Sequence, residues 1–308
     1  MSVPSSSAVP APAPSSPSSM LGFVALHFYC QLVLCPAHIV YGLLTGLVNP
    51  FAVTRHLCQV LGIRFLKSKH SQDLYQGDKK VVFLCNHRSW ADFFVDQVTC
   101  GGASYLARYM VWLGTPVSSL YGWMTHSTWF FNRKRGLDRA QFSQFMESNW
   151  ATRSGFGMIA YPEGTRNQNP EPLPLKTGVL HFAYEYKHPV QVVITTNKET
   201  AYNEKKFHYI HGTAVVTCFS KVLDPHEFAT QKEFVDKCRD TFIETWALAH
   251  SDEAEAVEYE PPMGREAPGY APPSEPFKTN LLRLAVFVLC VFIFTVTGAE
   301  STPLDQGI

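Results

Sequence analysis

Five short apolar runs in the middle of this 308-residue chain have the pattern of buried β-strands. They are rich in β-branched and aromatic residues, and turn-forming residues lie between them. We predict strands at residues 81–85, 129–131, 157–161, 190–194 and 213–219. Helical patterns cover residues 178–186 and 231–250, and another begins after Asp138. This alternation of strands and helices predicts an α/β fold, with a largely parallel sheet flanked by helices.

The segment from residue 20 to residue 48 is apolar and contains no Asp, Glu, Lys or Arg. It is longer than the roughly 20 residues that a membrane-spanning helix needs. Four residues interrupt it: His27, Gln31, Pro36 and His38. We predict that this segment associates with a membrane. The interruptions leave a spanning helix, a re-entrant segment and a helix lying on the membrane all open, beside burial in the protein core.

A second apolar run, from residue 284 to residue 299, is uninterrupted. Leu281, Leu282 and a snorkelling Arg283 can extend it, so we predict a transmembrane anchor at residues 281–299. Basic residues follow the first apolar segment and precede the second. By the positive-inside rule, both distributions predict that the domain between the two segments faces the cytosol.

The composition of the remaining segments predicts their organisation. Residues 1–19 are almost entirely Ser, Pro, Ala and Val, which predicts a disordered tail. Residues 251–277 are acidic and proline-rich, as in a linker, which leaves residues 55–250 as the folded domain. The formal net charge of +0 gives no indication of nucleic-acid binding. The eight cysteines are scattered without a C-x-x-C pair, which indicates buried thiols in a reducing compartment.

The predicted strand at 81–85 leads directly into Asn-His-Arg-Ser-Trp-Ala-Asp, residues 86–92. Ligands of open α/β sheets bind at the carboxyl ends of strands, which is where His87 is expected. Ser89, followed three residues later by Asp92, predicts a helix capped by Ser89 with Asp92 in its first turn. A carboxylate beneath His87 would fix the imidazole tautomer and leave the other nitrogen free to accept a hydroxyl proton. A His and an Asp that only cap a turn are the structural alternative.

Charged turns follow two further predicted strands. Four basic residues, Arg133 among them, come after the strand at 129–131 and indicate either a phosphate site or a solvated turn. Residues 162–167 follow the strand at 157–161 and combine a Pro, a Gly and two charged residues. We expect both turns at the same edge of the sheet as His87.

Residues 97–124 are rich in aromatic residues, Gly and Pro, and they include Arg108. This composition disfavours a simple membrane span. It leaves three interpretations open: an aromatic surface at a membrane interface, the lining of a groove for an acyl chain, or ordinary core packing.

Three blocks, in this order, resemble the motifs of the glycerolipid acyltransferase family, of the lysophosphatidic acid acyltransferase type. Asn86-His87-x4-Asp92 is similar to the N-H-x4-D block of the family. Phe131-Asn132-Arg133 is similar to a second block that ends in Arg, and Tyr161-Pro162-Glu163-Gly164-Thr165-Arg166 is similar to F-P-E-G-T-R. Lys176-Thr177-Gly178 resembles a following K-x-G. The resemblance covers roughly residues 75–200.

The resemblance implies a membrane-bound acyltransferase that uses acyl-CoA as co-substrate and needs no cofactor or metal. It implies that His87 is the general base on the free hydroxyl of lysophosphatidic acid, that Asp92 orients it, and that this hydroxyl attacks the thioester directly. It implies six acceptor-binding residues: Arg133, Glu163, Gly164, Thr165, Arg166 and Lys176. The product would be phosphatidic acid, and the expected location is the endoplasmic reticulum membrane.

Three alternatives stay open on the sequence alone. The same blocks serve acyltransferases with other acceptors, namely another lysophospholipid, glycerol-3-phosphate or dihydroxyacetone phosphate. A catalytically silent, membrane-anchored lipid-binding protein would keep the fold but would have no chemical need for the intact motifs. A metal site made of His87, Asp92 and Asp96 lacks a second histidine nearby and the usual spacing of zinc ligands.

Overall fold

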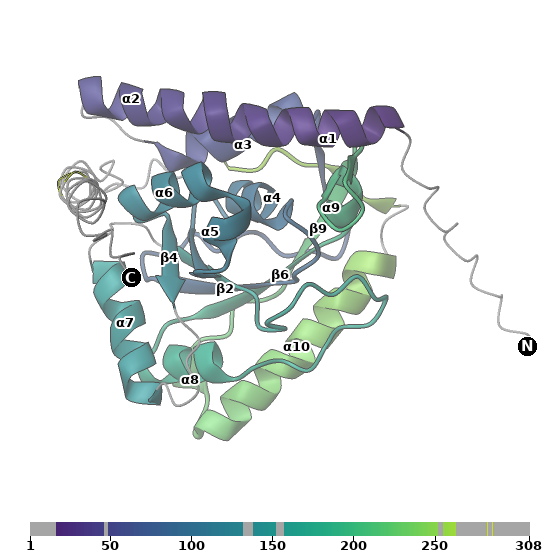
Figure 1. The fold of residues 1–308 in the computed structure, drawn as a ribbon. Helices are drawn as coiled ribbons and strands as arrows, with labels where there is room; N and C mark the ends of the chain where they lie inside the picture. Colours follow the sequence, from purple (N-terminus) through teal and green to yellow (C-terminus); the bar gives the residue numbers. More distant parts are fainter. Residues whose placement is uncertain are drawn as a thin grey trace, which may run out of the picture.

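The computed structural model describes residues 17–45, 49–131, 138–151, 157–251 and 255–262, together with Leu282 and Ala285. The strands form the middle layer of a layered α/β domain (Figure 1). Helices α7, α8 and α10 cover one face of the sheet, and α3, α4 and α6 lie on the other side. The helices of the domain are α3 (Pro50–Val60), α4 (Asp92–Thr99), α5 (Val111–Gly114), α6 (Pro116–Met124), α7 (Arg139–Ala151), α8 (Gly178–Glu185), α9 (Lys198–Ala201) and α10 (Gln231–Ser251), with a 3-10 turn, η2, at Pro225–Glu227.

The main sheet has eight strands in the order β10-β1-β9-β6-β2-β5-β3-β4. Its strands are β1 (Arg64–Lys67), β2 (Val81–Cys85), β3 (Ser104–Arg108), β4 (Thr128–Phe131), β5 (Gly157–Ala160), β6 (Val190–Thr195), β9 (Ala214–Phe219) and β10 (Val257–Glu258), while β7 (Tyr202–Asn203) and β8 (His208–Tyr209) form a separate pair. Strands β6, β2, β5, β3 and β4 are mutually parallel, and β9 runs antiparallel to β6. The predicted fold class is confirmed. Because helices cover both faces, β2 and β6 are buried at every residue.

All five predicted strands form, each within one residue of its expected ends. Three other strands of the main sheet were not predicted: β1 and β3, which are short and end in charged residues, and β10, which falls in the predicted linker. Strand β3 lies within the aromatic segment at 97–124 and pairs with β4 and β5. That segment therefore forms part of the domain interior as well as its surface, since pairing with two neighbours outweighs a weak local pattern.

A long helix crosses the top of the domain in Figure 1. It consists of α1 (Pro17–Tyr29), a π-helical turn η1 (Cys30–Leu34) and α2 (Cys35–Thr45). The π turn ends two residues before Pro36, which cannot donate to the helical ladder. The chain is therefore helical from Pro17, and the last three residues of the predicted disordered tail belong to this helix. Residues 1–16 lie outside the described residues, and the stretch Ser19–Gly42 is long and apolar enough to cross a membrane.

The polar residues that interrupt this apolar helix face the domain. The ring of His27 stacks on Trp90, with 5.7 Å between centroids. Gln31 is buried: its Nε2 donates to Ser118 Oγ at 2.6 Å, and its Oε1 accepts the N–H groups of Val117 and Ser118. Exposed apolar side chains lie elsewhere on the helix surface: Met20, Leu21, Val24, Phe28, Leu32, Val33, Val40, Tyr41 and Leu44. The helix thus packs its polar groups and part of its apolar surface, such as Phe23 and Leu34, on the domain, and it exposes the rest of its apolar side chains.

Part of the predicted linker at 251–277 belongs to the sheet. Strand β10 pairs antiparallel with β1, and Glu258 of β10 forms an ion pair with Arg64 of β1. The linker prediction was wrong for this stretch, because composition does not reveal a complementary strand edge elsewhere in the chain. The rest of the linker and the predicted anchor at 281–299 lie outside the described residues, apart from two isolated positions.

Candidate active site

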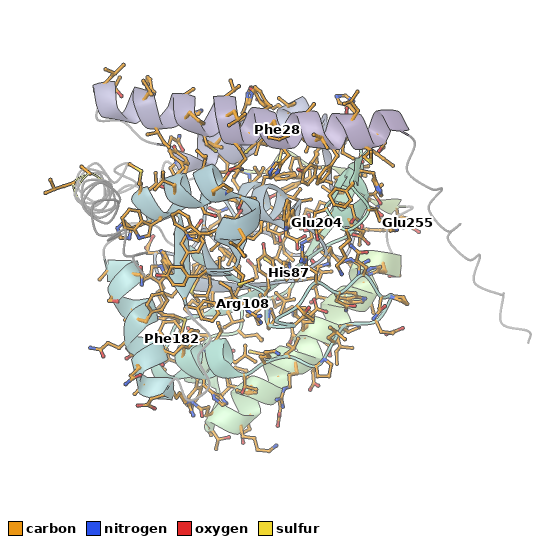
Figure 2. All side chains as sticks on the ribbon, in the orientation of Figure 1. Phe28, His87, Arg108, Phe182, Glu204 and Glu255 are labelled. Carbon is orange, nitrogen blue, oxygen red and sulfur yellow. The ribbon has the colours of Figure 1, made fainter. Side chains whose placement is uncertain are left out.

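Polar residues follow four parallel strands at the edge of the sheet where these strands end. Strand β2 leads into residues 86–92, and β5 leads into the turn at 161–167. Strand β3 ends in Arg108, and β6 is followed by Lys198. Figure 2 shows His87 and Arg108 in the same central region, and both line one cavity. This is the edge at which ligands of open α/β sheets bind.

His87 and Asp92 form a hydrogen-bonded pair, with 2.6 Å between His87 Nδ1 and Asp92 Oδ2. An ionised carboxylate only accepts hydrogen bonds, so Nδ1 carries the proton and Nε2 presents a lone pair. Nε2 has no hydrogen-bond partner within the part of the chain that the structure describes. The ring stacks on Tyr161, with 4.5 Å between centroids, and lines the cavity. The pair can therefore accept a proton from a group in the cavity.

The turn between the two residues brings Asp92 beneath His87. Asp92 Oδ2 also accepts the N–H groups of Arg88, at 2.7 Å, and Ser89, at 3.1 Å. The regular part of helix α4 begins at Asp92, and in the turn before it Ser89 Oγ accepts the N–H of Ala91 at 3.1 Å. Together with the bond from the Ser89 N–H to Asp92, this gives the reciprocal pair expected of the predicted cap, formed one turn before the regular helix. The Asp92 carboxylate takes up the N–H groups of the turn and so orders it before the helix begins.

A buried cation contacts the opposite oxygen of Asp92. Lys198 Nζ lies 3.2 Å from Asp92 Oδ1 and donates to both oxygens of Asp96, at 2.9 and 2.8 Å. It also donates to the carbonyl oxygen of Asn86 at 2.7 Å. Lys198, Asp92 and Asp96 are each 0% exposed. Charges are buried this completely only when they are paired and hydrogen-bonded, as these are.

This cluster fixes the charge on Asp92. Burial alone would raise the pKa of Asp92, but Lys198, His87 and the Arg88 N–H together lower it below its usual value. Burial raises the pKa of Asp96 to about 7; Lys198 opposes this shift and Asp92 adds to it. Burial would lower the pKa of Lys198, but the two carboxylates raise it. Lys198 lies against both carboxylates and so favours the ionised form of each.

Glu163 joins the turn after β5 to the turn after β2. Its carboxylate accepts the N–H of His87 at 3.1 Å, Nδ2 of Asn167 at 2.7 Å and the N–H of Leu173 at 3.1 Å. Glu163 is 2% exposed and is not among the residues that line the cavity. Glu163 therefore stabilises the backbone of both motif turns. It can influence an acceptor only through the position of these turns.

The cavity beside His87 has a volume of about 640 Å³. Arg108 and Lys176 lie on its wall without an ion-pair partner among the described residues, and Thr165 lines it too. Both cations contact Gly164: Arg108 donates to its carbonyl oxygen at 2.9 Å, and a Cβ on Gly164 would lie 2.5 Å from Lys176 Cε. Gly164 has a φ of +68°, so the backbone conformation favours glycine here, whereas the Lys176 side chain that a Cβ would meet is flexible and can move.

The other predicted cations are placed differently. Arg166 lines the cavity, but its guanidinium pairs with Glu204. The same carboxylate accepts the N–H of Trp90 at 2.9 Å. Arg133 lies outside the described residues. The positive charge left unpaired at the described wall of the cavity therefore comes from Arg108 and Lys176.

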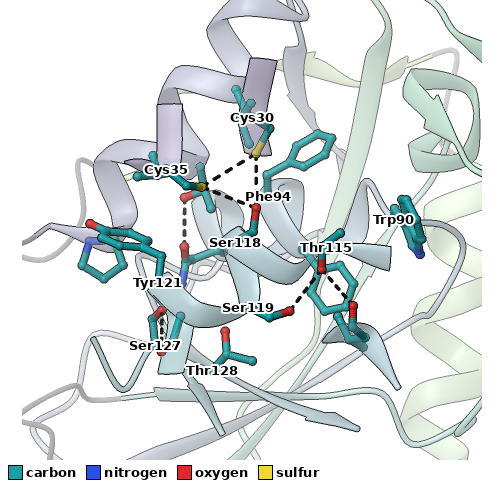
Figure 3. Close-up of a pocket in the computed structure, with 18 of the residues that line it drawn as sticks. Cys30, Cys35, Trp90, Phe94, Thr115, Ser118, Ser119, Tyr121, Ser127 and Thr128 are labelled. Atoms are coloured by element: carbon teal, nitrogen blue, oxygen red, sulfur yellow. Dashed lines mark hydrogen bonds between the residues drawn. The ribbon is translucent and has the colours of Figure 1, made fainter. Parts of the chain in front are cut away.

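An apolar cavity of about 140 Å³ adjoins the first one and shares Trp90, Phe93 and Val111 with it. It lies beneath the N-terminal helix and is closed by α3, α4 and α6 (Figure 3). Hydroxyl groups on its wall pair with each other, as do Thr115 Oγ1 and Ser119 Oγ at 3.2 Å. Most of the residues that line it are apolar, so the cavity suits an apolar occupant.

Arg108 and Lys198 were not predicted as site residues. Both obey the rule that located His87, because they lie at or just after the carboxyl end of a parallel strand. Arg108 was overlooked because β3 was not recognised. Lys198 lies outside the motifs, and its partner Asp96 is 102 positions away, which no local pattern indicates.

No group of three or more His, Cys, Asp or Glu residues within the described ranges could hold a metal ion. Asp96, a ligand in the metal alternative, is paired with Lys198.

Part of this chain is similar in sequence to known proteins. Residues 64–196 match the family model described as Acyltransferase. The human 1-acyl-sn-glycerol-3-phosphate acyltransferase beta is 39% identical over 143 residues, which cover 46% of this chain and 50% of the relative. The 1-acyl-sn-glycerol-3-phosphate acyltransferase of Cocos nucifera is 23% identical over 150 residues, 46% of either chain. The chain thus spans about half the length of these curated relatives.

A solved structure shows a similar fold. The crystal structure of the 1-acyl-sn-glycerophosphate (LPA) acyltransferase of Thermotoga maritima matches with a TM-score of 0.52, covering 75% of this chain and 95% of that chain. The sequence identity is 13%, so this likeness concerns the fold alone.

Glu163→Gln is expected to lower the free energy of unfolding by about 1–3 kcal/mol, because a neutral amide loses the charge-assisted bonds that the carboxylate accepts. Thermal or denaturant unfolding of the purified protein measures the change. Glu171→Gln, at an exposed position, is the matched control. Equal stability of the two variants would contradict the bridging role.

Proposed function

Because the chain belongs to the glycerolipid acyltransferase family, of the lysophosphatidic acid acyltransferase type, we propose that it transfers an acyl group from acyl-CoA to the free hydroxyl of lysophosphatidic acid. The product is phosphatidic acid. One observation carries this proposal: the free nitrogen of the His87–Asp92 pair belongs to a ring that lines a cavity with unpaired positive charge on its wall.

In the proposed reaction, His87 Nε2 takes the proton of the acceptor hydroxyl as its oxygen attacks the thioester carbonyl carbon. Asp92 stabilises the imidazolium that forms. The tetrahedral intermediate then collapses, the C–S bond breaks, and the imidazolium returns the proton to the departing thiolate of CoA. The acceptor hydroxyl is itself the nucleophile, so no acyl-enzyme forms.

The phosphate of the acceptor is proposed to bind Arg108 and Lys176. Both are exposed to the cavity and neither is neutralised by a carboxylate of the described residues. Arg133, to which the motif resemblance assigns the same task, remains a further candidate. Arg166 contributes less direct charge, because Glu204 already pairs with it. The apolar cavity beneath the N-terminal helix is the proposed site of an acyl chain, since it opens onto the same walls at Trp90.

The N-terminal helix is proposed to lie in the plane of the membrane surface. The helix lies across the domain (Figure 1), its residues His27 and Gln31 contact the domain, and many of its other side chains are apolar and exposed. A spanning orientation would carry the attached domain into the hydrocarbon layer, where loops and charged side chains are strongly disfavoured. An interfacial helix leaves the domain in water, with its lipid substrates close by. The cytosolic side and the endoplasmic reticulum are the proposed location.

His87→Ala is expected to lower kcat by about 10²–10⁴, because it removes the general base. Asp92→Asn should lower kcat as well, since the amide no longer selects the productive tautomer. The assay uses acyl-CoA with a panel of acceptors: lysophosphatidic acid, lysophosphatidylcholine, glycerol-3-phosphate and dihydroxyacetone phosphate. His226→Ala, an exposed histidine, is the control. Full activity of His87→Ala would exclude the mechanism, and a wild type inactive with every acceptor would favour the silent lipid-binding alternative.

Arg108→Ala and Lys176→Ala are each expected to raise KM for lysophosphatidic acid about tenfold or more, with a smaller change in kcat, because each removes a charged partner of the phosphate. Monoacylglycerol, which lacks the phosphate, serves as the comparison acceptor and should be little affected. Lys232→Ala on α10 is the control, since its side chain is exposed far from any motif. An equal loss with both acceptors would argue against phosphate binding.

Fluorescence quenching by brominated lipids is expected to show one shallow depth along the N-terminal helix. A fluorescent amino acid is placed at Leu21, Leu32 or Leu44 of the full chain in vesicles, all of which are exposed apolar positions. A helix lying flat gives similar quenching at all three. A spanning helix gives the deepest position at Leu32 and would overturn the interfacial arrangement. A probe at Lys232 should remain unquenched.

A further inference from the structure

A charged segment outside the sequence motifs, residues 198–204, supplies counter-charges to the motif turns. Its ion pairs are Lys198–Asp92, Lys198–Asp96, Glu199–Arg88 and Glu204–Arg166. Of these residues, Lys198 is the one that touches the partner of the proposed general base. It is 0% exposed and is not among the residues that line either cavity. Lys198 therefore cannot bind a substrate directly, and its effect on chemistry must pass through Asp92.

We propose that Lys198 is a positioning residue whose positive charge sets the pH range in which the His87–Asp92 pair acts as a base. Its effect on turnover rests on the proposed function, but its effect on the pair itself does not. The two oxygens of Asp92 have separate tasks: Oδ2 accepts from His87 at 2.6 Å, while Oδ1 faces Lys198 at 3.2 Å. Lys198 thus holds the carboxylate from the side opposite the imidazole.

The same cation balances two carboxylates. Asp92 and Asp96 lie one helical turn apart at the start of α4, and both contact Lys198 Nζ. Without that cation, two buried carboxylates would face each other, and such a pair takes up a proton more readily. Loss of the charge on Lys198 therefore favours protonation throughout the cluster, His87 included.

The remaining groups around the cluster do not replace this charge. The neighbouring thiols and phenols are those of Cys58, Cys85, Cys100, Tyr105 and Tyr161, and the carboxylate of Glu163, which adds no positive charge, accepts the N–H of His87. Burial raises the pKa of each of these thiols and phenols, so all are neutral near pH 7. The guanidinium of Arg88 is engaged by Glu199. Among the described residues, the charge balance of the cluster thus depends on Lys198.

Three variants of the full-length protein in detergent or vesicles test this role: Lys198→Met, Asp96→Asn and the double variant. The first measurement is kcat/KM against pH with lysophosphatidic acid and acyl-CoA. The acidic limb is the part of the profile where kcat/KM falls as the pH is lowered. In Lys198→Met this limb should move to higher pH by about one unit or more, because loss of a positive charge makes the His87–Asp92 pair easier to protonate. In Asp96→Asn it should move to lower pH by a smaller amount. The double variant should return toward the wild-type profile, since it removes one charge of each sign.

The second measurement does not need turnover. The imidazole nitrogen resonances of His87 are followed by NMR through a pH titration of the same variants. The titration midpoint should shift in the same directions as the acidic limb. If the wild type shows no acyl transfer but these shifts occur, the proposed function fails while the role of Lys198 stands. Lys232→Met is the matched control and should leave both readouts unchanged.

If Lys198 had only a structural role, Lys198→Met would lower activity at every pH but would leave the acidic limb of the kcat/KM profile and the NMR midpoint unchanged. That result would overturn the proposal. It would also be overturned if the double variant shifted as far as Lys198→Met alone. If Lys198→Met does not fold, Asp96→Asn and the double variant still decide, because only the double variant lacks the positive charge, so its acidic limb should lie at higher pH than that of Asp96→Asn.

Discussion

The burial of one negative charge, on Asp92, constrains the whole candidate site. A carboxylate at 0% exposure is stable only if its hydrogen-bonding capacity is filled. Here the imidazole of His87 and two backbone N–H groups of the preceding turn donate to Oδ2, and the ammonium of Lys198 balances the charge 3.2 Å from Oδ1. Each of these contacts fixes something else: the tautomer of the imidazole, the path of the turn, or the position of the segment after β6.

The parallel sheet makes this arrangement possible. Strands β2, β3, β5 and β6 end at one edge, so segments far apart in the sequence meet there. Glu163, after β5, holds the N–H of His87, after β2. Lys198, after β6, contacts the Asp92 side chain on the helix after β2. The charges that stabilise the site are therefore supplied by different crossovers of the fold, and the loss of one partner would leave another buried and unpaired.

The N-terminal helix links this site to the proposed membrane surface. His27 stacks on Trp90, which lines both the cavity beside His87 and the apolar cavity beneath the helix. Gln31 caps the start of α6 from within the apolar helix. The polar residues that seem out of place in an apolar segment are thus the ones that attach it to the domain. This explains how the helix can expose apolar residues on one side and still belong to the folded domain.

The sequence by itself determined the fold class, five strands and the contents of the motif turns, because burial on both faces of a sheet leaves a local apolar pattern. It also led to the family, through blocks whose order and spacing are local. Tertiary structure decided what depends on pairing across the chain: the strands β1, β3 and β10, and the pairing of Arg166 with Glu204. It also revealed Arg108 and Lys198. A charge at the end of a strand has no periodicity, and whether it faces a cavity or a buried carboxylate is set by the strands that the fold places beside it.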